Sequence, residues 1–490
     1  MNKMMISRRG FLGTGSALLA VSGCATPGGA CGKSSKKHTL CRDIPVEDGY
    51  DIVVAGGGPG GYAAAISAAR AGARVLLVES QGCLGGMGTS GLVLEWGSYG
   101  GARMKMVAGI AAEIRDILEE RGFAFQPQKV PDPITHVVNF HPEGLKLVLD
   151  EIMAKEGIEV RFFTQVVDVE RDRDAFHVNG VIINNMEGLR YVKAKAFIDG
   201  TGDALLAKMC NAPCFEPDDP MPPTLMAMVD GIDWSSMELE GCGLILNQRP
   251  VIDKAIADGF FTQPDRHVPG IFQSFGNRGN MNAGHVFDMS SLNCRSLSDG
   301  MVKGRKQVQE YLKFYQTYFK EFAKARLVST APLMGVRDSR RIRGEYWLTL
   351  DDFKAHKHFP DQIAINAATI DLHVRNTSAE EYKRFSESFF KPLFKDGEYY
   401  GIPYGTLVPK GSQNLWVAGR SLSCDTQTHA AQRSQIYCIL YGQAAGTAAA
   451  QAISSGQTAC NLNTKTLIES LRAQNCILPQ EELSETMTKN

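Results

Sequence analysis

The stretch YDIVVAGGGPGGYAAAISAARAGARVLLVES constrains the fold of this 490-residue chain more than any other part of the sequence. An apolar run at 51–55 suits a buried parallel strand, and Gly56, Gly58 and Gly61 follow it as G-x-G-x-x-G. A helix of small residues and a second apolar strand come next, and that strand ends at Glu79. The order of strand, glycine loop, helix, strand and acid predicts a Rossmann-like unit that binds a dinucleotide.

Each residue type in this unit has a physical reason. The first glycine allows a tight turn, the second lets the backbone approach a pyrophosphate, and the third lets the helix pack close to the strand. The start of the helix offers unpaired N–H groups and a partial positive charge to the phosphates. Glu79 stands where a carboxylate accepts hydrogen bonds from ribose hydroxyls. This unit by itself fits NAD and FAD equally well.

Three later segments favour FAD. They are KAFIDGTGDALLA at 195–207, NLWVAGRSLS at 414–423 and GQAAGTAAAQA at 442–452. These segments resemble the later FAD-contacting motifs of the glutathione-reductase-type flavoproteins. The resemblance implies an α/β fold in which an FAD-binding Rossmann-like domain is assembled from separated segments, with an inserted α+β substrate domain.

Longer segments carry a second resemblance. HPEGLKLVLDEIMAKEGIEVRFFTQVVDV at 141–169, GVRDSRRIRGEYWLT at 335–349 and YGIPYGTLVPKGSQNLWVAGR at 400–420 resemble the bacterial FAD-dependent oxidoreductases over roughly residues 50 to 455. The resemblance implies an oxidoreductase with non-covalent FAD. The residues expected at the cofactor are Gly56, Gly58, Pro59, Gly60, Gly61, Glu79, Ser80, Gly85, Gly86, Gly202, Asp203, Gly419, Arg420 and Gly442.

The chain begins with a targeting segment, MNKMMISRRGFLGTGSALLAVSGC. Arg8 and Arg9 before Phe-Leu resemble a twin-arginine signal, and VSGC resembles a lipobox that would place a lipid on Cys24. The apolar part is shorter than the span of about 20 residues that a bilayer needs. We expect export by the twin-arginine machinery to the periplasm or cell surface, with the lipid as the only membrane anchor. The alternatives are an ordinary charged leader and a plain cleavage site beside a bystander thiol.

We expect five regions from these patterns. They are a signal peptide at 1–24, a flexible tether at 25–49, an FAD-binding domain at 50–204 and 400–460, an inserted substrate domain at 205–399, and a helical tail at 461–490.

Export and FAD are mutually consistent, because FAD is inserted in the cytoplasm and the twin-arginine route carries folded proteins. NAD(P)H is scarce outside the cytoplasm, and the sequence has no second dinucleotide motif. We therefore expect an enzyme that acts on a small organic substrate and exchanges electrons with a cytochrome or quinone-linked carrier. Two alternatives stay open: an FAD-loaded electron-transfer protein without small-molecule turnover, and a non-redox FAD-dependent lyase or hydratase.

Composition and cysteine spacing argue against nucleic acid and metal ions as binding partners. The chain has 52 basic and 53 acidic residues, so nothing favours nucleic acid. The 12 cysteines are scattered without a CxxC pair, and no metal site is expected. His356 and His358 have no further ligands nearby in the sequence. A disulfide between Cys31 and Cys41 in the tether is one expectation.

Four residues are candidates for the chemistry. His429 and Arg433 stand four apart before the last glycine-rich helix, where the resemblance places them on the substrate side of the flavin. A histidine there would transfer protons, and an arginine would hold a carboxylate or enolate. Arg337 is the candidate from the cluster RDSRRIRGEY, and His285 lies in the inserted segment. Structural roles, such as a backbone hydrogen bond for His429 and a salt bridge for Arg433, are the alternatives.

Aromatic residues recur at intervals of three and four between Tyr311 and Phe322. This spacing predicts a helix whose aromatic stripe faces the core. A docking face for a redox partner or a lipid surface is the alternative.

Overall fold

A five-stranded parallel sheet carries the glycine loop, in the order β24-β13-β2-β3-β9. Ile52 of β2 pairs with Val75 of β3 on one side and with Ala196 of β13 on the other. All but the edge strand β9 are buried along their whole length, which explains their unbroken apolar runs. The strands are β2 (Ile52–Ala55), β3 (Val75–Val78), β9 (Glu159–Arg161), β13 (Ala196–Asp199) and β24 (Leu415–Val417).

The computed structural model describes residues 41–97, 100–101, 104–125, 137–240, 244–245, 248–266, 270–389 and 394–479. The expected signal peptide, Cys24 and Cys31 lie outside these residues. The chain divides into two units, Met1–Asp43 and Ile44–Asn490, and the elements below all belong to the second unit. The predicted boundaries of the inserted domain stay a prediction. No helix of the described residues is long and apolar enough to cross a membrane.

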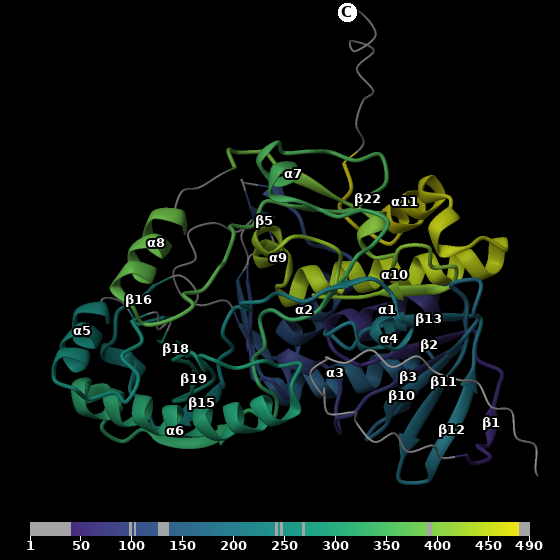
Figure 1. Ribbon diagram of the computed structural model, residues 1–490. Helices are drawn as coiled ribbons and strands as arrows, with labels where there is room; N and C mark the ends of the chain where they lie inside the picture. The colour runs from purple at the N-terminus through teal and green to yellow at the C-terminus, as the bar shows by residue number, and fades with distance from the viewer. Residues whose placement is uncertain are drawn as a thin grey trace, which may run out of the picture. The chain divides into compact units, whose positions relative to one another are not determined.

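Helices α1 (Pro59–Arg70) and α10 (Gln435–Ser455) lie against one another on one face of the parallel sheet (Figure 1). A Cβ atom on Gly442 would stand 2.1 Å from the carbonyl oxygen of Gly60, and one on Gly446 would stand 2.1 Å from that of Ala64. The two helices therefore pack backbone to backbone, which only glycine allows. This pairing joins a segment near residue 60 to one near residue 440.

A four-stranded sheet covers the other face of the parallel sheet. Ile52 and Val54 belong to the core under α1 and α10, whereas Val53 and Ala55 belong to the core shared with this second sheet. Alternate residues of β2 thus serve two cores, because successive side chains point to opposite faces of a strand. The sheet contains β1 (Val46–Glu47), β12 (Gly188–Lys193), β11 (Val178–Asn185) and β10 (Gln165–Arg171) in that order.

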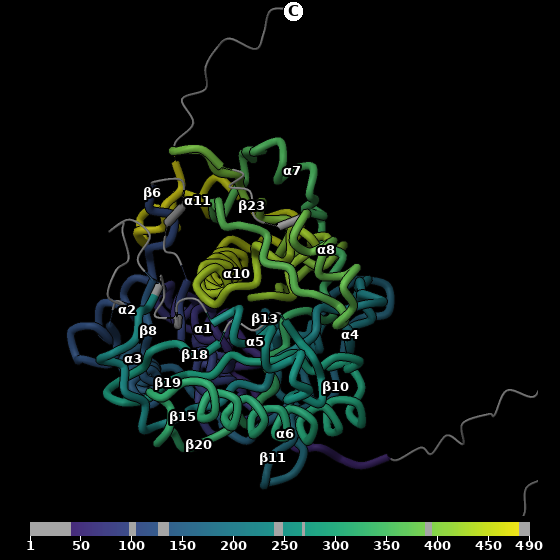
Figure 2. Tube along the Cα trace, turned by 90° about the vertical axis from the view of Figure 1, so that its left-hand side faces the viewer, coloured from purple at the N-terminus to yellow at the C-terminus, as the bar shows by residue number. Residues whose placement is uncertain are grey.

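A six-stranded antiparallel sheet forms a third core with the long helix α6 (Cys294–Tyr318), which crosses this sheet in Figure 2. Tyr311, Phe314, Tyr315 and Phe322 are buried in this core, so the prediction of a core-facing aromatic stripe is confirmed. The strands, in sheet order, are β16 (Leu239–Glu240), β17 (Leu244–Ile245), β18 (Gly270–Gln273), β19 (Gly279–Asn282), β15 (Ala227–Asp230) and β20 (Arg326–Thr330).

The predicted α/β architecture, with a Rossmann-like unit built from separated segments, is confirmed. The elements used below are α5 (Arg249–Ala257), β22 (Gln362–Asn366), α8 (Ala379–Phe389), β23 (Tyr400–Pro403), α9 (Thr426–Gln432) and α11 (Thr464–Ala473).

Candidate functional site

A cavity of about 940 Å³ opens where β2, β3, β13 and β24 end at their carboxyl edge. Ligands of open parallel sheets bind at this edge, outside the carboxyl ends of the strands. Most of the residues expected at the cofactor line the cavity, namely Gly56, Gly58, Pro59, Gly60, Glu79, Ser80, Gly86, Gly202, Asp203, Gly419 and Arg420.

The glycine loop fits a dinucleotide. Gly56 has a φ of +94°, and a Cβ on Gly61 would stand 1.8 Å from the Gly56 carbonyl oxygen. A Cβ on Gly58 would meet no described heavy atom nearer than the Gly200 oxygen, at 4.0 Å. The space over Gly58 is therefore open to the cavity, while Gly56 and Gly61 shape the turn. Such a cradle leaves room for a pyrophosphate at the start of α1.

Glu79 holds this loop as well as lining the cavity. Its Oε2 accepts a hydrogen bond from the Gly57 N–H at 2.7 Å, and its Oε1 accepts one from the Gln81 N–H at 2.8 Å. The carboxylate is largely buried at the end of β3. Glu79 thereby fixes the distance between the loop and the second strand, and its remaining lone pairs suit ribose hydroxyls.

Arg420 and Asp203 connect two other glycine turns across the cavity wall. Arg420 Nη2 donates to Asp203 Oδ1 at 2.6 Å, and both residues line the cavity. Gly202 and Gly419, next to them in the chain, have φ values of +80° and +99°. Both turns therefore need glycine, and this requirement explains the glycines in the sequence motifs G-T-G-D and A-G-R.

Three residues expected at the cofactor are not among the described residues that line the cavity, and their role there stays a prediction. Gly61 and Gly442 are the close-contact points of α1 described above. Gly85 has a φ of +102° and donates its N–H to the Gly57 carbonyl at 2.9 Å. These glycines are needed for close packing behind the site, because a Cβ at Gly61 or Gly442 would collide with backbone and Gly85 has a positive φ.

Two of the candidate catalytic residues, Arg337 and Arg433, line the same cavity. Arg433 Nη2 donates to the Asp371 carboxylate at 2.6 Å. Arg337 Nη1 donates to the Pro222 carbonyl at 3.0 Å and to Thr224 Oγ1 at 2.9 Å. Burial, and secondly the positive charge of Arg433, lower the pKa of Arg337. The structure thus brings two guanidinium groups to one wall of the cavity.

The structure places His429 behind the wall of the cavity. The side chain is fully buried, and Nε2 donates to the Arg420 carbonyl at 2.9 Å. Burial, followed by the charges of Arg341 and Arg433, lowers the pKa of His429 well below its ordinary value. A neutral histidine bonded to backbone fits a positioning role for Arg420. Arg433 follows it by one helical turn, because the Arg433 N–H donates to the His429 carbonyl at 3.1 Å at the end of α9.

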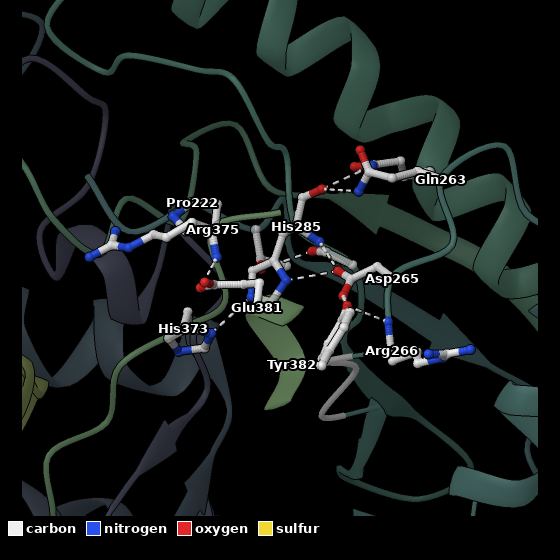
Figure 3. A network of polar contacts seen from close by, with 12 residues as sticks. Pro222, Gln263, Asp265, Arg266, His285, His373, Arg375, Glu381 and Tyr382 are labelled. Carbon is white, nitrogen blue, oxygen red and sulfur yellow. Dashed lines mark hydrogen bonds and ion pairs between the residues drawn. The ribbon is translucent and has the colours of Figure 1, made fainter. Parts of the chain in front are cut away.

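His285 reaches the cavity through a second histidine. His285 Nδ1 lies 2.7 Å from Asp265 Oδ2, and its Nε2 lies 2.8 Å from His373 Nδ1 (Figure 3). His373 lines the cavity, and its Nε2 lies 3.5 Å from Asp371 Oδ2. The sequence analysis missed His373, since a single histidine in a loop after β22 carries no spacing signal.

The other arginines of the cluster at 337–343 have partners in the protein, and Arg340 also lines the cavity. Arg341 and Asp338 form a buried ion pair, and Arg340 pairs with Glu216 at 2.7 Å. Arg343 stacks over Trp347. Within the part of the chain that the structure describes, no group of three or more histidine, cysteine or acidic residues could hold a metal ion.

A comparison with protein families covers the whole of this site. A family model described as FAD dependent oxidoreductase matches residues 51–471. Dihydrolipoyl dehydrogenase from Trypanosoma brucei brucei is 56% identical over 45 residues, which make up 9% of this chain and 9% of that protein. The chain therefore spans less than a tenth of the length of this curated relative.

Solved structures resemble the fold at low sequence identity. A geranylgeranyl bacteriochlorophyll reductase-like protein from Thermoplasma acidophilum is 14% identical with a TM-score of 0.43, over 87% of this chain and 83% of that one. The flavin-dependent brominase Bmp2 is 14% identical with a TM-score of 0.45, over 88% and 84%.

The family match covers the glycine loop, the acid at the end of β3 and both later glycine turns. The expectations of an oxidoreductase and of FAD are confirmed: this chain belongs to the FAD dependent oxidoreductase family, and FAD is its cofactor.

Proposed function

We propose that this protein is an exported FAD-dependent oxidoreductase that oxidises or reduces a small carboxylated organic molecule. In this proposal, a respiratory or quinone-linked carrier supplies or removes the electrons. The observation that carries the choice of substrate class is the state of Arg337 in the cavity wall.

Arg337 is a buried cation that forms no direct ion pair with a described carboxylate, although the charges of Asp371 and Asp265 act on it from farther away. Its exposed fraction is 9%, and none of the described carboxylates lies within 4.0 Å of its guanidinium. Arg341 and Arg433, by contrast, each pair with an aspartate. A buried charge is costly to leave unpaired, so an anion from the substrate would offset the desolvation of Arg337.

The surroundings of Arg337 suit a small organic anion. Arg433 lines the same cavity and its charge is offset by Asp371, so Arg337 is the guanidinium left for a substrate carboxylate, which it can bind through two parallel hydrogen bonds. Apolar side chains complete this part of the lining, among them Met226, Leu333, Met334 and Leu297. Apolar walls with a few convergent polar groups are typical of small-molecule sites.

When bound, FAD supplies two-electron transfer to or from the substrate. The residues of this chain bind FAD and the substrate and orient them. The open backbone at Gly58 and the start of α1 receive the phosphates, and the Arg420–Asp203 pair holds the two later glycine turns at the cavity. The start of α10 contributes Ser434, Gln435 and Cys438 to the lining, where the helix dipole favours negative charge.

The export part of the proposal rests on the sequence. Arg8 and Arg9 precede a short apolar segment that ends at Cys24. A cofactor that is made in the cytoplasm and an address for folded proteins are consistent with one another. Because NAD(P)H is scarce outside the cytoplasm, a carrier in the membrane is the expected electron partner.

A binding experiment tests the substrate class. Purified holoprotein is titrated with small carboxylates (acetate, lactate, succinate, fumarate) and with the matching amides, and the flavin absorbance is recorded. We expect carboxylates, and not amides, to perturb the flavin spectrum. Arg337→Gln should weaken binding about 10- to 100-fold, as expected for a charged hydrogen bond of about 1.5–3 kcal/mol.

Arg343→Gln is the matched control, because Arg343 belongs to the same sequence cluster and stacks on Trp347. This variant should bind carboxylates like wild type. Equal responses to amides and carboxylates, or wild-type binding in Arg337→Gln, would refute an anionic substrate. A protein whose flavin responds to no small molecule and only exchanges electrons with carriers would favour the electron-transfer alternative.

A further inference from the structure

A chain of hydrogen-bonding groups leads from the protein interior to the cavity. Asp265 is fully buried, and its Oδ1 accepts a hydrogen bond from the Tyr382 hydroxyl at 2.8 Å. Its Oδ2 contacts His285 twice, at the backbone N–H (2.9 Å) and at Nδ1 (2.7 Å). His285 in turn contacts His373, whose ring is 5% exposed and lines the cavity. Figure 3 shows His285 between Asp265 and His373.

Each member of this chain is held by a different element. Asp265 follows α5, His285 follows β19, and Tyr382 lies on α8. The His285 carbonyl accepts hydrogen bonds from Gln263 Nε2 at 2.7 Å and from Gln307 Nε2 of α6 at 3.0 Å.

The loop that carries His373 is tied to α8 as well. Glu381 accepts a hydrogen bond from the Arg375 N–H at 2.9 Å, two residues after His373. The two imidazole rings are therefore fixed from several sides before any ligand binds.

The order of donors and acceptors sets the positions of the protons. The ionised Asp265 carboxylate can only accept, so His285 Nδ1 carries a proton. In neutral His285 the lone pair is then on Nε2, and His373 Nδ1 must donate to it. In neutral His373 the lone pair is consequently on Nε2, where the Asp371 carboxylate at 3.5 Å raises the affinity for a proton. Burial lowers the pKa of both rings, and the charge of Arg337 acts in the same direction, so the neutral forms prevail at pH 7.

We propose that His373 is the catalytic base of the site, with His285 and Asp265 as positioning residues that receive the positive charge. This inference rests on the proposed function, and it narrows the substrate to a carboxylate whose oxidised carbon carries a hydroxyl group. Oxidation breaks one C–H and one O–H bond and forms a carbonyl group. The hydride equivalent goes to FAD, and the hydroxyl proton goes to Nε2 of His373.

The charges around the pair support uptake of this proton. A proton gained at His373 Nε2 faces the Asp371 carboxylate at 3.5 Å. The proton on Nδ1 can then shift to His285, which places the positive charge against Asp265. The charge of Arg337 opposes this positive charge until the substrate carboxylate neutralises Arg337. Binding of the anion and uptake of the proton are thereby coupled, and the reverse reaction returns the proton.

Nuclear magnetic resonance tests the proton positions without any substrate. Holoprotein labelled with 15N-histidine is studied at pH 7.5, and ring signals are assigned by their loss in His285→Gln and His373→Gln. We expect protonated Nδ1 and unprotonated Nε2 in both rings. Asp265→Asn should remove this preference in His285. A proton on Nε2 of neutral His373 in wild type overturns the inference, whether or not any carboxylate binds.

Kinetics test the role of His373. Anaerobic flavin reduction by a hydroxycarboxylate such as lactate, chosen from those that bind, should slow about 10²- to 10⁴-fold in His373→Gln. The wild-type rate should fall with acid only well below the ordinary histidine pKa of about 6.5, and this fall should vanish in His373→Gln. Added imidazole should restore part of the rate in His373→Gly.

The control is His356→Gln, since His356 stacks on Phe394 at 4.5 Å and lies outside the hydrogen-bonded chain. Unchanged carboxylate binding with slow reduction in His373→Gln supports the inference. Equal rates in His373→Gln and His356→Gln overturn it and leave the proposed function standing. Absence of any carboxylate binding in wild type refutes the proposed function, and with it the substrate assigned to His373.

Discussion

His429 donates a hydrogen bond from Nε2 to the carbonyl oxygen of Arg420, at 2.9 Å. Arg420 lines the cavity and pairs with Asp203. The buried His429 therefore fixes the backbone of Arg420, and with it one side of the cofactor site. A buried carbonyl without a donor costs about 1–3 kcal/mol. His429→Ala should therefore weaken FAD retention and lower the free energy of unfolding by about that amount.

His429→Gln offers an amide N–H in place of the ring N–H and should restore most of the FAD retention. The measurement is FAD per protein after gel filtration, together with urea unfolding. Full FAD occupancy in His429→Ala combined with a lost catalytic rate would instead make His429 a proton-transfer residue.

Substitutions at Gly58 and Gly61 should distinguish a loss of FAD binding from a loss of folding. A Cβ on Gly58 would point into open cavity space, with the nearest described atom at 4.0 Å. A Cβ on Gly61 would stand 1.8 Å from the Gly56 oxygen. Gly58→Val should fold but bind no FAD, because the valine side chain fills the space of the pyrophosphate. The denatured variant should therefore release no FAD. Gly61→Ala should be poorly folded, as circular dichroism and thermal unfolding would show.

Much of the nucleotide-binding half could be predicted from local sequence. The strand at 51–55, the glycine loop and the turns at Gly202 and Gly419 each have a strict backbone requirement that leaves a mark in the sequence. The role of Gly442 was harder to predict, because a glycine needed at a helix contact resembles a glycine needed at a ligand.

The substrate side could be predicted only in part. Arg337 and Arg433 were nominated from the sequence, and they do line the cavity. The link from Asp265 through His285 to His373 joins residues 20 and 88 positions apart, and no period or motif relates them. Tertiary structure alone brings such residues together, which is why the sequence indicated His285 and missed its partner.

Two buried arginines should lose different amounts of stability on the same substitution. Arg341 is paired with Asp338 in the interior, so Arg341→Met leaves a buried carboxylate without its partner and should cost about 3–5 kcal/mol. Arg337 has no carboxylate partner among the described residues, and Arg337→Met removes only the hydrogen bonds to the Pro222 carbonyl and Thr224, so it should cost about 1–3 kcal/mol. Thermal unfolding of both variants, with and without a bound carboxylate, checks this difference. A large loss of stability in Arg337→Met would contradict the view that Arg337 waits for a ligand anion.

Export depends on Arg8 and Arg9 in our proposal. Replacing both with lysine should leave the protein in the cytoplasm with its FAD bound, because lysine keeps the charge and loses the twin-arginine signal. Fractionation of cells that express each form measures this. Export at the wild-type level would exclude the twin-arginine route. Uptake of labelled fatty acid, and its loss in Cys24→Ala, tests the lipid anchor separately.

The exchange of electrons between the flavin and a small carboxylate tests the central claim most directly. Holoprotein is prepared without oxygen in its oxidised form and in the form reduced by dithionite. Each form is mixed with every carboxylate that binds, with the matching amide, and with NADH and NADPH. The flavin absorbance is then followed over time. The account predicts that at least one carboxylate changes the redox state of the flavin, and that its amide and the nicotinamides react far more slowly. Arg337→Gln should raise the carboxylate concentration needed by about 10- to 100-fold. Equal rates with amides, or an unchanged concentration dependence in Arg337→Gln, would contradict the account.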